Sequence, residues 1–219
     1  MRVAIAGGHG KVALRLTRLL TQRGDEVRSL IRNPDHEPDV RHEGAEPVIC
    51  DLEEASEDEV AVAVGVLDAI VFAAGAGPGS GPERKWTMDY GGAVKLIAAA
   101  KKNGIRRYVI VSSMGADPDA RRKADDDEDV FAIYQAAKGK ADQELAESGL
   151  DYTICRPGGL TDEPGLNRVD AREEVERGRI PRDDVAAVLA AVLATPSTIG
   201  KTFCVVSGDT EIYEAVEGL

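Results

Sequence analysis

The sequence predicts an α/β protein with a doubly wound, mainly parallel sheet and helices on both faces. Three observations predict this fold. Short apolar runs alternate with helical patterns along the chain, the run at 67–74 is apolar enough to be a strand covered on both faces, and the first run ends in a glycine turn that opens a helix. The 219 residues fit one domain, with a core of about 1–158 and a small C-terminal extension of about 159–219.

After the first strand and a helix that closes at Arg23, we expect five strands at 26–32, 46–52, 67–74, 107–113 and 151–155 and a last strand at 202–206. Helices are expected at 56–66, 86–102, 130–147 and 183–194 and at the C-terminal end. Ser56 and Glu59 have the spacing of a capping box at the start of the first of these helices, 56–66. The glycine- and proline-rich stretch 75–82 suits a loop over a site, and the acidic run 125–129 is either a solvated loop or the first turn of the helix that follows.

Composition excludes several classes of function. The chain has 27 basic and 39 acidic residues, a formal net charge of −12, which disfavours nucleic acid and anionic membranes as partners. No apolar stretch reaches about 18 residues and no secretory signal opens the chain, so we expect a cytoplasmic protein. Its three cysteines are expected to be buried free thiols, and its three histidines lack metal-site spacing, so we expect no metal.

The glycine turn Gly7-Gly8-His9-Gly10 predicts a dinucleotide site, because such a turn brings backbone N–H groups and the positive end of a helix to a phosphate. Two registers fit, Gly7-x-x-Gly10-x-x-Ala13 and Gly8-x-Gly10-x-x-Ala13, and a purely structural turn is the alternative. The cofactor-binding residues predicted in and just after this turn are Gly7, His9, Gly10, Lys11 and Val12.

The strand ends predict the rest of the cofactor site, since ligands of such sheets bind at the carboxyl ends of the strands. Arg32 closes the second strand where an acidic residue would select NAD, and an arginine can grip a 2′-phosphate, so we expect NADP(H) in preference to NAD(H). A solvated surface arginine is the alternative. Asp51 either orients the adenine with Leu52 or forms a turn, and the small residues Ala73, Ala74 and Gly75 leave room for a ribose.

A set of polar residues follows the fifth strand. Ser112 and Ser113 close that strand, and Tyr134 and Lys138 share one face of the next helix at i and i+4. A free tyrosine has a pKa near 10, and a nearby ammonium group moves a phenol toward the range useful for acid–base catalysis. A surface tyrosine–lysine pair is the alternative reading.

Taken together, these motifs resemble the short-chain dehydrogenase/reductase superfamily, and more narrowly its atypical NAD(P)H-binding members, which are epimerase/dehydratase-like and NmrA-related. The residues that carry the resemblance are Gly7–Gly10, Arg32–Pro34, Cys50–Leu52, Val111–Ser113, Tyr134, Lys138, Arg156–Gly158 and Arg182–Ala186. They span nearly the whole chain. The resemblance implies a Rossmann-type fold in which the C-terminal extension lies on the substrate side.

The resemblance also implies roles for individual residues. Tyr134 would be the general acid/base, Lys138 would bind the nicotinamide ribose and lower the tyrosine pKa, and Ser113 would position the substrate oxygen. Ser112 is grouped with the cofactor-binding residues, and Pro157, Gly158 and Leu160 would border the nicotinamide. The chain departs from the family in having Asp89 where many relatives have asparagine, Ala13 in place of a third glycine, and a short C-terminal region.

The function expected from this site is hydride transfer between NADP(H) and a small carbonyl or quinone-like substrate, with Tyr134 delivering the proton. Two alternatives stay open, a non-catalytic NADP(H)-sensing protein of the NmrA-like type and a sugar-nucleotide epimerase or dehydratase. The short C-terminal region and Arg32 weigh against the last of these. We expect a small-molecule substrate as the partner and leave a homodimer open.

Overall fold

The computed structural model describes residues 1–77, 79–123 and 129–219. Within them a nine-stranded sheet has the order β11-β8-β10-β6-β5-β4-β1-β2-β3. Its strands are β1 (Arg2–Ala6), β2 (Glu26–Ile31), β3 (Glu46–Ile49), β4 (Ala69–Phe72), β5 (Arg107–Val111), β6 (Asp151–Pro157), β8 (Arg168–Arg172), β10 (Lys201–Ser207) and β11 (Thr210–Glu211). All neighbours from β3 to β10 pair in parallel, while β8 pairs antiparallel with both β10 and β11. The predicted doubly wound, mainly parallel sheet is confirmed.

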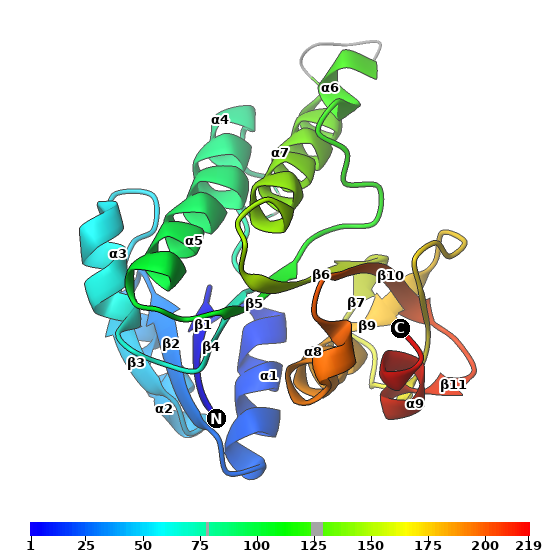
Figure 1. Cartoon of the computed structure of the whole chain (residues 1–219), viewed down its shortest axis with the longest axis horizontal. Coiled ribbons are helices and arrows are strands. Elements are labelled where there is room, and N and C mark those ends of the chain that lie inside the picture. The colour runs from blue at the N-terminus through cyan, green and yellow to red at the C-terminus, as the bar shows by residue number, and fades with distance from the viewer. Residues whose placement is uncertain (78, 124–128) are drawn as a thin grey trace.

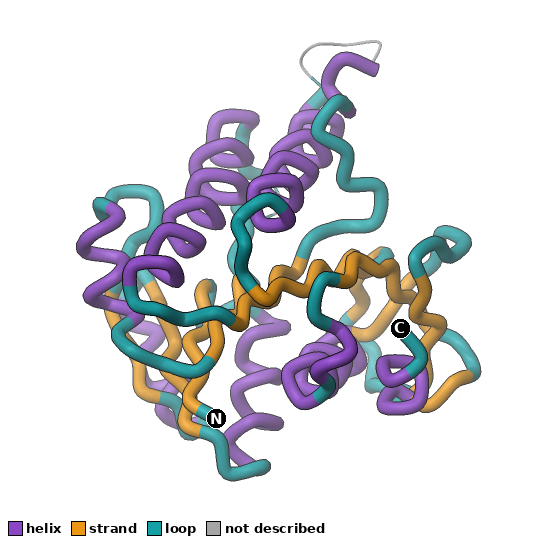
Figure 2. Tube along the Cα trace, in the orientation of Figure 1, coloured by secondary structure: helices purple, strands orange, loops and turns teal. Residues whose placement is uncertain are grey.

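Helices cover both faces of the sheet (Figures 1 and 2). One face carries α1 (Lys11–Gln22), α8 (Arg182–Ala194) and α9 (Ile212–Glu217), and the other carries α3 (Glu57–Val64), α5 (Ala93–Lys102) and α7 (Val130–Ala146). The shorter helices are α2 (Glu37–His42), α4 (Pro82–Arg84) and α6 (Ala120–Lys123). Two apolar cores result, one on each side of the sheet. None of the helices in the described residues is long and apolar enough to cross a membrane.

Local sequence explains several helix starts. Ser56 and Glu59 form the predicted capping box on α3, with each side chain bonded to the backbone N–H of the other residue. Asp129 caps α7, since its Oδ1 accepts from the N–H groups of Phe131 and Ala132. The rest of the acidic run, 125–128, lies outside the described residues.

Three predictions of elements need correction. The strands expected at 46–52, 67–74 and 107–113 end earlier, at Ile49, Phe72 and Val111, because the residues after them turn away to form the site. The helix expected from residue 86 begins as a π-helix, η2 (Lys85–Gly92). The C-terminal extension, for which one strand and two helices were expected, also holds β8, β11 and a two-stranded sheet of β7 (Gly159–Thr161) and β9 (Arg179–Pro181).

Candidate functional site

The glycine turn lies where the winding of the sheet reverses, because β1 has β2 on one side and β4 on the other. Gly7 has a φ of +75°, and an added Cβ there would lie 2.6 Å from Ala74 Cα. An added Cβ on Gly8 would lie 2.5 Å from the Ser29 Cβ, and Gly8 N–H donates to the Leu30 carbonyl at 2.9 Å. Both glycines of the alternative registers are therefore required, Gly7 by the segment after β4 and Gly8 by β2.

The start of α1 can receive an anion. Gly10 precedes the helix, no side chain in the described residues caps it, and its first turn holds no acidic residue. The N–H groups of that turn thus keep their positive potential for a ligand. These features fit the diphosphate of a dinucleotide, as predicted from Gly7, Gly10 and Val12, which is buried.

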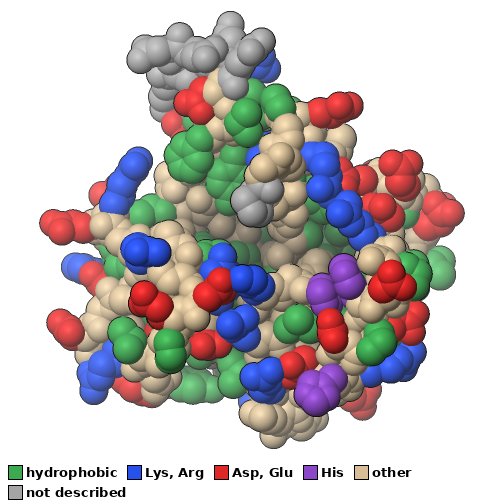
Figure 3. Space-filling model, turned by 180° about the vertical axis from the view of Figure 1, so that it is seen from behind, with side chains coloured by type: hydrophobic (Ala, Val, Ile, Leu, Met, Phe, Trp, Pro, Cys, Tyr) green, Lys and Arg blue, Asp and Glu red, His purple; other side chains and the backbone are tan. Residues whose placement is uncertain are grey.

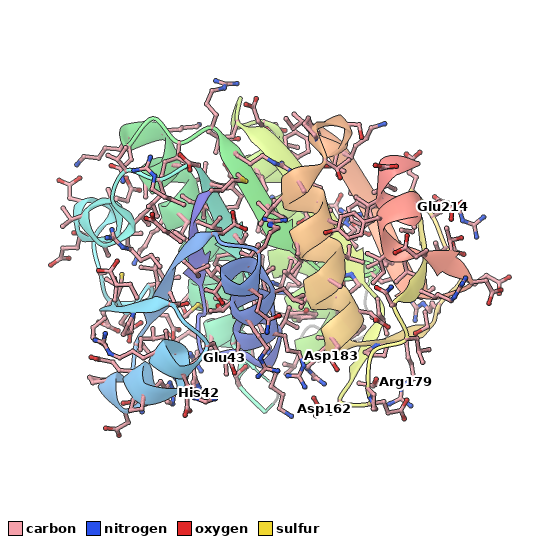
Figure 4. The ribbon with its side chains drawn as sticks, turned by 90° about the horizontal axis from the view of Figure 1, so that it is seen from below. His42, Glu43, Asp162, Arg179, Asp183 and Glu214 are labelled. Carbon is pink, nitrogen blue, oxygen red and sulfur yellow. The ribbon has the colours of Figure 1, made fainter. Side chains whose placement is uncertain are left out.

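Lys11, the first residue of α1, reaches across to the C-terminal extension. Its Nζ lies 2.5 Å from Asp162 Oδ2, and Arg182 bonds the other carboxylate oxygen at 2.9 Å. The hydrogen bond from Lys11 holds the pKa of Asp162 below its usual value. Arg15 forms a similar ion pair with Asp183. Figure 4 shows Asp162 and Asp183 together near the start of α8.

The adenosine end of the site, the part around Arg32 and Asp51 where the adenosine of the cofactor is predicted to bind, contains more charged side chains than expected. Arg32 is half-exposed and its Nη1 lies 3.7 Å from Glu53 Oε2. Arg84 donates to the same carboxylate at 2.6 Å through Nη2, and Thr87 donates at 2.6 Å. These hydrogen bonds, above all those from Arg84, hold the pKa of Glu53 below its usual value. Asp51 Oδ1 accepts from Glu53 N–H at 3.0 Å, which is the turn-forming role among the two predicted.

His9 joins the glycine turn to the segment after β2. Its ring stacks on His36 with centroids 3.6 Å apart, and its Nε2 lies 2.8 Å from Asp39 Oδ2. The predicted ligand residue His9 therefore has a carboxylate partner. Leu52, also predicted, is buried, and its carbonyl accepts from Lys95 Nζ at 2.8 Å.

Lys138, one of the predicted catalytic residues, lies at the end of β5 and has a carboxylate partner that the sequence did not predict. Lys138 is buried, and its Nζ donates to the Val111 carbonyl at 3.0 Å and lies 3.4 Å from Asp89 Oδ1. Asp89 is buried too; its Oδ2 accepts from Ala76 N–H, and its Oδ1 accepts no hydrogen bond in the described residues. The departure from asparagine at position 89 thus gives Lys138 a carboxylate partner.

Tyr134 is half-buried and has a different lysine beside it. Lys85 Nζ lies 5.4 Å from the centroid of the Tyr134 ring and donates to the Gly77 carbonyl at 2.9 Å. Lys85 is the first residue of the π-helix, a distortion that is frequent at functional sites. Sequence reasoning missed Lys85, because an α-helical pattern gives no reason to place it next to Tyr134.

The two serines after β5 differ in burial and in their hydrogen-bond partners. Ser112 is buried and donates to Asp142 Oδ2 at 2.8 Å, an oxygen that also accepts from Arg156. Burial raises the pKa of Asp142, and Arg156 opposes this shift. Ser113 is half-buried, with its Oγ 3.4 Å from the Met114 carbonyl. Ser113 is therefore the less engaged of the two hydroxyls, and its role on the substrate side stays a prediction.

The segment after β6 closes this side of the site. The Pro157 carbonyl accepts from Met114 N–H, and Gly158 N–H donates to the Val205 carbonyl, so the segment is fixed between β5 and β10. An added Cβ on Gly158 would lie 2.4 Å from the Gly178 carbonyl oxygen, which explains the glycine. Leu160 is partly exposed.

The face that carries these residues is hollowed below α4 and α7, and basic side chains and histidines gather along the rim of the hollow (Figure 3). The structure brings Gly7, Gly10, Ala73 and Ala74 together, since an added Gly10 Cβ would also lie 3.8 Å from the Ala73 carbonyl oxygen. Gly75 stands beside Asp89, whose Oδ1 would lie 3.1 Å from an added Cβ.

Sequence reasoning missed Glu53, Arg84 and Asp162. Glu53 directly follows the Asp51-Leu52 motif, so its position could have been noticed. Asp162 and its partner Lys11 are 151 residues apart, and no sequence spacing signals such a contact. No group of His, Cys, Asp or Glu in the described residues is placed to hold a metal. The cysteines are free; Cys50 and Cys155 are buried as predicted, whereas Cys204 is only half-buried.

The chain matches a family model described as NAD(P)H-binding over residues 7–196. It is 38% identical to the protein named uncharacterized sugar epimerase YhfK from Bacillus subtilis strain 168, with 100% of each chain covered. A solved structure from Bacillus halodurans, assigned as an NAD-dependent epimerase/dehydratase, has 40% identity and a TM-score of 0.91 with full coverage of both chains. The oxidoreductase ylbE from Lactococcus lactis has 29% identity and a TM-score of 0.86, covering 100% of this chain and 96% of its own.

These matches extend over nearly the whole chain and agree with the sheet order and the glycine turn. The resemblance drawn from the motifs is therefore confirmed at the level of fold and nicotinamide cofactor. The chain belongs to the NAD(P)H-binding family of Rossmann-type proteins, whose relatives are oxidoreductase- and epimerase/dehydratase-like.

Proposed function

We propose that this protein is an NADP(H)-dependent oxidoreductase that acts on a small carbonyl or quinone-like compound. The observation that carries the proposal is the place of Lys138, which lies one helical turn after Tyr134 on α7 and whose Nζ donates to the last carbonyl of β5, two residues before Ser113. A protein that only senses the cofactor has no need of this set. The ylbE relative is itself described as an oxidoreductase.

The cofactor site proposed for this reaction runs along the strand ends. The first turn of α1 and the glycine turn would hold the diphosphate, Arg32 the 2′-phosphate, and Pro157 to Leu160 would border the nicotinamide. When bound, the nicotinamide supplies or accepts the hydride. We expect NADP(H) to be preferred because Arg32 keeps donors free for a phosphate.

The protein's own residues handle the proton. Tyr134 donates its hydroxyl proton to the substrate oxygen during reduction, and the Ser113 hydroxyl holds that oxygen in place. Lys138 is fixed between the Val111 carbonyl and Asp89, and from there it would bind a ribose hydroxyl of the cofactor. Lys85 adds a second ammonium beside the Tyr134 ring.

The test uses Tyr134→Phe in the full chain, with Tyr213→Phe on the exposed face of α9 as the matched control. Small aldehydes, ketones and quinones are screened with NADPH and NADH by nicotinamide absorbance, and cofactor affinity is measured by nicotinamide fluorescence. We expect Tyr134→Phe to lower kcat by about 10²- to 10⁴-fold with nearly unchanged cofactor affinity.

Turnover by Tyr134→Phe at the wild-type rate would remove Tyr134 from the mechanism. Cofactor binding by the wild type without turnover of any compound in the screen would favour the sensing alternative.

A further inference from the structure

Glu53 is a charged residue at the adenosine end that the proposed reaction does not use. It lies in the turn after β3, and its side chain is only 14% exposed. It accepts hydrogen bonds from Arg84 Nε at 3.0 Å, from Arg84 Nη2 at 2.6 Å and from Thr87 Oγ1 at 2.6 Å. Such a bidentate, charge-assisted contact is strong and directional.

This contact engages Arg84 fully. Its remaining nitrogen, Nη1, donates to the Ala76 carbonyl at 3.2 Å, so the guanidinium is directed at the protein on every side. Arg32 differs, because it has only the 3.7 Å ion pair with Glu53 and makes no side-chain hydrogen bond within the described part of the chain. Two arginines therefore face the adenosine end, but the carboxylate of Glu53 occupies one and partly neutralises the other.

A 2′-phosphate bound by Arg32 would meet this carboxylate. If the phosphate accepts from the same Nη1, it lies within about 7 Å of Glu53 Oε2, because the two contacts share that atom. At this distance like charges repel appreciably even in a solvated site. Because Arg84 holds the pKa of Glu53 below its usual value, the carboxylate is charged at neutral pH.

We propose that Glu53 is a specificity-determining residue of the nucleotide site, whose negative charge opposes a 2′-phosphate and keeps Arg84 from binding it. This inference rests on the proposed function and on Arg32 as the phosphate ligand. It implies that the preference of the wild-type protein for NADPH over NADH is smaller than it would be if Arg32 and Arg84 faced the phosphate without a nearby carboxylate. Replacing the carboxylate with an amide releases Arg84 and removes the repulsion.

The experiment compares three full-length variants by fluorescence titration with NADPH and with NADH. Glu53→Gln keeps the size of the side chain and one acceptor oxygen but removes the charge, and it should raise the preference for NADPH by about three- to tenfold. Arg84→Gln leaves Glu53 with fewer cationic partners and should lower the preference by about threefold. Glu46→Gln is the matched control, since Glu46 is an exposed arginine partner at the other end of β3; it should leave the preference unchanged.

The two main variants are expected to move the preference in opposite directions, and high salt should shrink both effects. The inference is overturned if Glu53→Gln leaves the ratio of the two dissociation constants unchanged or lowers it. If thermal unfolding shows that Glu53→Gln does not fold, Arg84→Gln decides, and an unchanged or raised preference in that variant overturns the inference. Failure of the wild type to bind either nucleotide refutes the proposed function instead.

Discussion

The buried pair of Lys138 and Asp89 makes a sharp prediction about stability. The side chains are 3% and 1% exposed, so Lys138→Met leaves a carboxylate in the core. Asp89 then retains one hydrogen bond, from Ala76 N–H, because its Oδ1 accepts none in the described residues. Removal of one partner of a buried ion pair costs about 3–5 kcal/mol. In a protein of this size that cost lowers Tm by roughly 6–20 °C.

The measurement is thermal and urea unfolding, followed by circular dichroism without cofactor. The double variant Lys138→Met/Asp89→Asn should be more stable than the sum of the single changes predicts, by about 2 kcal/mol, because neither charge is left alone. The control is Lys102→Met, which breaks an exposed 2.6 Å pair with Asp58 and should cost less than about 1 kcal/mol. Additivity of the two core changes would refute the assignment of Asp89 as the charge partner of Lys138.

Two further predictions concern the glycine turn and acid stability. Gly7→Ala forces a Cβ against Ala74 at a positive φ and should lower the free energy of unfolding by about 2–3 kcal/mol. Gly10→Ala should fold normally but lower the affinity for the cofactor about tenfold. If both variants were equally stable and lost cofactor affinity to the same extent, this prediction would be contradicted. The pKa of Glu43 is lowered, first of all by its hydrogen bond with Arg18. The Glu43–Arg18 pair therefore stabilises the folded protein above the usual glutamate pKa of 4.5. This stability is lost as the pH falls through the lower pKa that Glu43 has in the folded state. Glu43→Gln should therefore be less stable than wild type by about 1 kcal/mol at neutral pH, with a smaller loss on acidification; parallel stability curves from neutral to acid pH would refute this.

The sequence was sufficient for the fold and the cofactor class because both depend on local patterns. The apolar run at 69–72, the glycines of the turn and the Ser56–Glu59 capping box each fix their own backbone, and the parallel order follows from the alternation of strands and helices. The position of Lys138 at the end of β5 follows from the same pattern.

Side-chain partners could not be predicted in this way, because they depend on distant segments. The approach of Lys85 to Tyr134 follows from a π-helix that replaces the expected α-helical start. The partners of Glu53 come from positions 32, 84 and 87, which periodicity does not connect. The strands at 168–172 and 179–181 are short and charged, and they are stabilised by pairing with β10 and β11 in the large sheet and with β7 in the small one.

The packing of α1 on α8 has a consequence for how the protein is made. The apolar face of α1, with Leu16 and Leu20, belongs to the same core as Val185 and Leu189 near the other end of the chain. While the nascent chain emerges from the ribosome, the helix that follows the glycine turn has no covering partner until about residue 194 has been synthesised. A polypeptide stopped before α8 should therefore expose this apolar surface to chaperones and to aggregation, even though its glycine turn is already complete.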